Sequence, residues 1–130
     1  MYFAFKFQAR VNFPCIQRFG FAVFRLVEHP VFVKKILPAI DQVSILDIGC
    51  CLGADLRGVI AKGGKLENLV GLELETDFIK LGYEFFGDAD KPGMKNVFRH
   101  GDVLKADPFG GELADLKGRF DYVCLSFYYG

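Results

Sequence analysis

The chain has 130 residues, of which 52% are hydrophobic and 15 are phenylalanine, so it fits one folded domain with a substantial core and is not a disordered chain. Sixteen basic residues balance sixteen acidic ones, which excludes the basic footprint of a nucleic-acid binder. Charged residues interrupt every apolar window in residues 1–27, so we expect neither a signal peptide nor a membrane span. We therefore expect a cytoplasmic protein whose partner is a small molecule.

Residues 14–40 carry apolar side chains at helical intervals, interrupted at His29-Pro30. This pattern predicts two amphipathic helices, because proline disfavours a helical residue before it. We take residues 1–42 as an amino-terminal helical segment that leads into a second unit, residues 43–130.

Short apolar runs alternate with helical patterns through the second unit. Such alternation is typical of an α/β fold with a parallel sheet, whose buried strands are almost continuously apolar. The predicted strands are residues 43–48, 68–74, 96–100 and 120–127. We expect a helix over 54–62 that stops at Gly63-Gly64, and a second helix with Thr76 as its N-cap that stops at Gly87-Asp88.

A strand breaks into a glycine-marked turn and then a helix between Ile45 and Leu56. The turn glycines, Gly49 and Gly53, are spaced G-x-x-x-G, and Asp47 precedes them. A pyrophosphate needs backbone amides and no nearby carboxylate, whereas a ligand with an amino group suits Asp47. S-adenosylmethionine is such a ligand, and its carboxylate suits the start of the following helix.

Two further acids follow the next two strands. Glu73 comes twenty residues after Gly53, the interval at which a βαβ unit presents a carboxylate to ribose hydroxyls. Asp102 follows the third strand, where a short acid can reach the exocyclic amine of adenine. A glycine turn alone is more often a plain connection, and Glu75 and Asp77 compete with Glu73 for the ribose role.

The sequence resembles the class I S-adenosylmethionine-dependent methyltransferases in four segments. These are Leu46–Gly53, Gly71–Glu73, Gly101–Val103 and Phe120–Leu125. The resemblance implies that Asp47, Gly49 and Gly53 line the methionine end of the cofactor, Glu73 the ribose and Asp102 the adenine. Their neighbours Cys50, Cys51, Leu74 and Val103 complete the predicted cofactor site, and no catalytic residue is predicted.

A closer likeness is to a fungal group of natural-product methyltransferases, which act on meroterpenoids and polyketides. It is carried by Phe13–Ile16, His29-Pro30, Cys50-Cys51, Asp55–Arg57 and Phe78–Tyr83. The resemblance implies transfer of a methyl group to an oxygen of a small terpenoid or polyketide.

The sequence departs from this family in two ways. Cys51 replaces the usual middle glycine of the first motif, and the family fold has seven strands, whereas this chain stops after the fourth. We therefore expect a truncated, incomplete Rossmann-like sheet of order 3-2-1-4 with helices on both faces, in which residues 43–130 form a partial cofactor-binding domain.

Two rival functions stay open. The first is a non-enzymatic, methyltransferase-like interaction protein that forms homo-oligomers through its amino-terminal helices or its open fourth-strand edge. The second is a nicotinamide-dependent oxidoreductase fragment, which Asp47 and the missing third glycine disfavour. The cysteines indicate packing thiols rather than a metal site, because the adjacent Cys50 and Cys51 lack C-x-x-C spacing.

Overall fold

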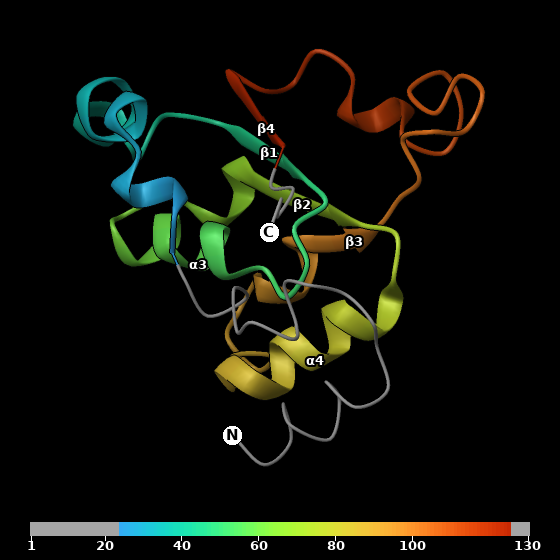
Figure 1. The fold of residues 1–130 in the computed structure, drawn as a ribbon, viewed down its shortest axis with the longest axis horizontal. Coiled ribbons are helices and arrows are strands. Elements are labelled where there is room, and N and C mark those ends of the chain that lie inside the picture. The colour runs from blue at the N-terminus through green and yellow to red at the C-terminus, as the bar shows by residue number, and fades with distance from the viewer. Residues whose placement is uncertain (1–23, 126–130) are drawn as a thin grey trace.

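The computed structural model describes residues 24–125, so the beginning of the first expected helix and the end of the last apolar run lie outside the described residues. Four parallel strands pair in the order β3-β2-β1-β4, which confirms the predicted α/β fold (Figure 1). The strands are β1 (Ile45–Ile48), β2 (Leu69–Glu73), β3 (Phe98–His100) and β4 (Tyr122–Leu125). Each lies inside its predicted run.

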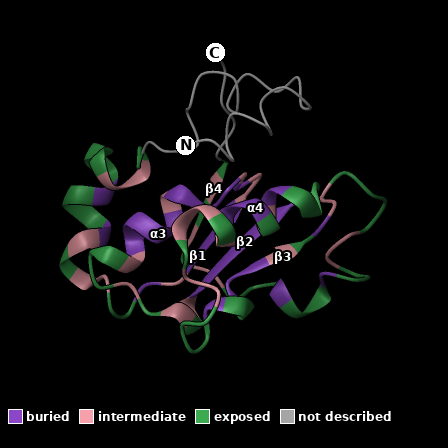
Figure 2. Cartoon of the chain, turned by 90° about the horizontal axis from the view of Figure 1, so that it is seen from below, coloured by how far each residue is buried: buried purple, intermediate pink, exposed green. Residues whose placement is uncertain are grey.

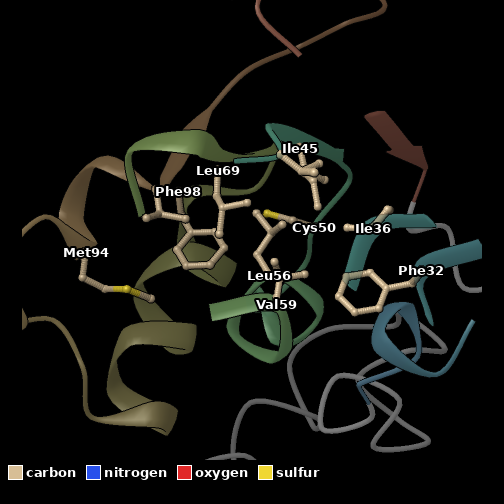
Figure 3. Close-up of a cluster of buried hydrophobic side chains, with 11 residues drawn as sticks. Phe32, Ile36, Ile45, Cys50, Leu56, Val59, Leu69, Met94 and Phe98 are labelled. Carbon is tan, nitrogen blue, oxygen red and sulfur yellow. The ribbon is translucent and has the colours of Figure 1, made fainter. Parts of the chain in front are cut away.

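The strands divide the core into two clusters, because successive side chains point to opposite faces of the sheet. Ile45 and Asp47 point to the first face, and Leu46 and Ile48 point to the second. The first-face cluster is the larger, and Figure 3 shows Phe98 and Leu69 from the sheet packed with Leu56 and Val59 from the helical side. In Figure 2 the central strands are buried.

Both α-helices, α3 (Ala54–Ala61) and α4 (Thr76–Phe86), pack on the first face, and within the described residues the helix on the second face is a 3₁₀ helix. Right-handed crossovers from β1 to β2 and from β2 to β3 place both helices on one side. The link from β3 to β4 runs in the opposite direction and covers the second face with Leu113 and Leu116. It contains only the 3₁₀ helix η7 (Ala114–Leu116).

The link between β3 and β4 has a composition that explains why no α-helix forms in it. Pro108, Gly110 and Gly111 lie between eight and eleven residues after the end of β3, and these residue types disfavour helix interiors. Hydrogen-bonded turns form there instead, from Gly110 and Leu113 back to the carbonyls of Asp107 and Pro108.

The segment before β1 breaks at His29-Pro30, as predicted. His29 is extended (ψ 136°) and ends the 3₁₀ helix η2 (Leu26–Glu28). Beyond it lie the π-helix η3 (Phe32–Ile36) and the 3₁₀ helix η4 (Leu37–Ala39), rather than a regular α-helix. Pro38 has no N–H to donate to the preceding turn, so the helical hydrogen-bond pattern changes where it enters.

The start of α4 corrects a further prediction. Thr76 is the first helical residue rather than the N-cap; Glu75 occupies the cap position and makes no side-chain cap hydrogen bond. The Glu75 N–H donates to the Glu73 carboxylate (3.1 Å), which fixes the entry to the helix one residue earlier. Gly87 ends the helix in the left-handed region (φ 66°), as expected.

No helix within residues 24–125 has the length and apolar character needed to cross a bilayer.

Gly82 allows α4 to lie directly against the chain after β1. An added Cβ at Gly82 would overlap the carbonyl oxygen of Leu52, which is backbone and cannot rotate away. We expect Gly82→Ala to reduce the free energy of unfolding by about 1–3 kcal/mol, although the same change usually stabilises a helix. Urea denaturation followed by circular dichroism measures this loss.

Gly58→Ala in α3 is the matched control for Gly82→Ala. Its Cβ would meet only side-chain carbons of Phe24 and Val27, at 3.0–3.3 Å, and these can shift. Equal losses in the two variants would show that Gly82 has no special packing role.

Candidate functional site

Residues 49–53 form a tight turn at the carboxyl end of β1. Three of them have positive φ angles: Gly49 (73°), Cys51 (53°) and Gly53 (79°). The N–H groups of Gly49 and Cys50 both donate to the carbonyl of Leu72 in β2, at 2.9 and 3.0 Å. The turn is therefore tied to the neighbouring strand and leads directly into α3.

The Glu73 carboxylate lies against this turn. It is 8% exposed, and it accepts hydrogen bonds from the backbone N–H of Cys51 (2.8 Å) and of Glu75 (3.1 Å). An ionised carboxylate offers about four acceptor positions, so these two bonds leave room for others. Glu75 and Asp77 are exposed, so among the three acids Glu73 is the one that contacts the turn.

Asp47 is fully buried in β1, between Gly71 of β2 and Cys124 of β4. Burial first, and then the charges of Asp47 and Glu73, raise the pKa of the Cys50 thiol well above its usual value. Burial, Asp47 and Asp55 raise the pKa of Cys124 to about 11. Both thiols therefore stay protonated at neutral pH and are poor nucleophiles. The carboxylates of Asp47 and Glu73 place negative charge at this end of the sheet.

The loop after β3 lies beside the end of β2, since the N–H of Gly101 donates to the carbonyl of Glu73 (3.1 Å). Asp102 is half-buried, and its Oδ1 accepts a hydrogen bond from the N–H of Leu104 (2.9 Å). Leu74 is exposed at the same edge of the sheet. Val103 packs instead against the second-face cluster.

The predicted site residues therefore differ in placement. The structure brings together Asp47, Glu73 and the turn, and it sets Asp102 and Leu74 at the same edge. A cavity of about 570 Å³ lies elsewhere, near the starts of β2 and β3, and none of the predicted site residues lines it. In the described part of the chain no three His, Cys, Asp or Glu side chains lie close enough to hold a metal ion.

Arg57 contacts the turn through the carbonyl of Leu52, and the sequence motifs do not predict this role. It is 7% exposed, and its Nη1 donates to the carbonyl of Leu52 (2.6 Å). Its Nε and Nη2 donate to the two carboxylate oxygens of Asp88, at 2.7 and 2.9 Å. The available signal was its position in α3, one helical turn after Gly53.

Comparison with known proteins relates the chain to fungal methyltransferases. It is 36% identical to the O-methyltransferase phiE of a fungal species over 110 residues, which are 83% of this chain and 35% of the relative. It is 30% identical to the O-methyltransferase atr3 of Stereocaulon alpinum over 117 residues, 89% of this chain and 33% of that protein. The Asnovolin E/Chermesin D methyltransferase nvfJ of Aspergillus novofumigatus is 26% identical over 121 residues, 93% of this chain and 42% of its own.

These matches confirm the resemblance to fungal natural-product methyltransferases that the sequence motifs indicate. The chain spans between a third and about two fifths of the length of these relatives. No family model matches the chain. No solved structure matches it either.

Cys51 adopts a left-handed conformation that glycine tolerates and other residues rarely do. At most positions a glycine variant is less stable than an alanine variant by roughly 0.5–1 kcal/mol. At position 51 we expect the reverse order, with Cys51→Gly at least as stable as Cys51→Ala, because alanine keeps the strain and glycine relieves it. Urea denaturation of the two variants measures the difference; a more stable alanine variant would contradict the strained turn.

Proposed function

We propose that residues 43–125 bind S-adenosylmethionine at the carboxyl edge of the sheet, as the donor-binding part of a methyltransferase. The observation that carries the proposal is the convergence of acids from three successive strands on one edge. Asp47 is in β1, Glu73 ends β2 beside the turn, and Asp102 follows β3. The relatives' names support a methyltransferase.

The chemistry of this edge fits the proposed cofactor. An electronegative edge suits a ligand that carries a sulfonium and an ammonium group, and it repels a pyrophosphate. Glu73 keeps acceptor positions for ribose hydroxyls while it holds Cys51. Asp47 and the missing third glycine disfavour the alternative of a nicotinamide-dependent oxidoreductase, whose dinucleotide carries a pyrophosphate.

The cofactor, when bound, supplies a methyl group on a positively charged sulfur. The residues of this chain would bind and orient that donor, and much of the catalysis of such a transfer can come from positioning. We propose a small natural product, such as a terpenoid or polyketide oxygen, as the acceptor, and a cytoplasmic location. One relative is named for asnovolin E and chermesin D, which fits an acceptor of this kind. We assign no catalytic residue.

A second candidate function rests on the outer edge of β4. Within residues 24–125 this strand pairs only with β1, and Val123 and Leu125 are 58% and 64% exposed. An uncharged, apolar strand edge is a template for pairing with another chain. A homo-oligomer formed through this edge is therefore the alternative to a monomeric donor-binding protein.

Titration calorimetry with S-adenosylhomocysteine tests the cofactor proposal. We expect the wild-type protein to bind, and Glu73→Ala to weaken binding by about 1–3 kcal/mol, because a charge-assisted hydrogen-bond acceptor for the ribose is lost. Glu75→Ala is the matched control: it removes an exposed acid two residues away and should leave the affinity unchanged. A folded wild-type protein that releases no heat of binding would refute the proposal.

Size-exclusion chromatography with light scattering tests the role of β4. If copies pair through this edge, wild-type protein elutes as a defined oligomer, and Val123→Lys shifts it to the monomer because a charge blocks the strand edge. Lys117→Ala, at an exposed position outside the strand, controls for a change of charge. A wild-type monomer that binds S-adenosylhomocysteine would argue for the first function alone.

A further inference from the structure

We propose that Arg57 is a positioning residue for the cofactor turn: its guanidinium, fixed by Asp88, holds the carbonyl of Leu52 and thereby sets the conformation of residues 49–53. This inference rests on the proposed function, because it concerns how the same site is shaped. It adds a residue pair, Arg57 and Asp88, that contacts the turn at the carbonyl of Leu52.

The position of the Arg57 guanidinium is fixed by Asp88, independently of its contact with the turn. Two of its nitrogens bind the two oxygens of Asp88, at 2.7 and 2.9 Å, which is the bidentate geometry that sets both the position and the plane of the group. The third nitrogen, Nη1, donates to the Leu52 carbonyl at 2.6 Å. Asp88 follows α4, so the position of this helix determines where the Arg57 guanidinium lies.

Aromatic rings close the space around the guanidinium. Its carbon lies 4.4 Å from the ring centre of Phe86, 4.6 Å from that of Phe98 and 5.5 Å from that of Tyr83. The side chain of Arg57 is 6% exposed. The cation is therefore stacked and shielded from water, so its hydrogen bonds are stronger than exposed ones and its position is narrowly defined.

The contact with Leu52 is made in the middle of the left-handed part of the turn. Leu52 lies between two residues with positive φ, Cys51 and Gly53. On the outer side, Glu73 holds the N–H of Cys51, and the N–H of Gly53 donates to the carbonyl of Cys50 (2.8 Å). On the inner side, Arg57 is the donor to Leu52, so its loss frees the turn to shift and leaves a buried carbonyl without this bond.

A lysine cannot reproduce this arrangement. Its ammonium is a single point of charge, whereas the role of Arg57 needs a planar group that binds Asp88 with two nitrogens and Leu52 with a third. Arg57→Lys therefore keeps the charge and removes the geometry. Asp88→Asn keeps the shape of the partner and removes its charge.

Two measurements on the full chain test the positioning role: the hydrogen-exchange rate of the Gly53 amide by NMR, and the affinity for S-adenosylhomocysteine by calorimetry. In Arg57→Lys and Asp88→Asn we expect at least about tenfold faster exchange at Gly53 and at least about tenfold weaker binding, since a small shift of a binding group has a large effect. The exchange rate reports on the turn without any ligand.

Tyr83→Phe is the matched control. Its hydroxyl donates to the carbonyl of Met94 (2.8 Å), so the variant loses a hydrogen bond in the same cluster and keeps the ring beside Arg57. We expect it to lower the melting temperature while Gly53 exchange and ligand affinity stay within about twofold of wild type.

The positioning role is wrong if, in Arg57→Lys, either Gly53 exchange or the loss of affinity is no greater than in Tyr83→Phe. Absence of binding by the wild-type protein contradicts the proposed function instead. In that case Gly53 exchange in the same variants still decides whether Arg57 fixes the turn.

Discussion

A guanidinium cannot be buried in an apolar core without partners, because the loss of its hydration costs several kcal/mol. Arg57 meets this condition through groups that are far apart in the sequence: the carbonyl of Leu52, the carboxylate of Asp88 and the rings of Phe86 and Phe98. The turn after β1, the end of α4 and β3 must therefore come together around one side chain. The close approach at Gly82 is a further consequence, since α4 has to reach the Leu52 carbonyl from the same side.

Glu73 links the structural and the functional interpretation of the turn. Its two backbone hydrogen bonds fix Cys51 and the entry to α4, which is sufficient reason for a buried acid at the end of β2. The same position faces the edge where the acids of β1 and β3 converge. A structural role and ribose binding do not compete for this carboxylate, because backbone donors use only part of its acceptor capacity.

The sequence could predict the sheet and its acidic edge because both follow from short-range patterns. Buried parallel strands are apolar runs, and their carboxyl ends meet at one edge, so Asp47 and Glu73 fall close together. Arg57 and Asp88 are 31 residues apart and belong to no periodic pattern, so only the three-dimensional fold reveals their contact. The Thr76 cap was mispredicted for a different reason: the carboxylate of Glu73, a local acid, binds the N–H of Glu75, and Glu75 rather than Thr76 occupies the cap position.

The proposed donor site and the exposed strand β4 involve different parts of the sheet. The elements that hold the turn are α3, α4 and residues of β2 and β3, and the helices cover the first face. Leu46 and Ile48 point to the second face, and their partners in register are the exposed Val123 and Leu125 of β4. A partner that covers these second-face side chains lies on the opposite side of the sheet from Arg57 and Glu73. A protein that pairs through β4 could thus keep the proposed donor site intact, so the two candidate functions are compatible in one molecule.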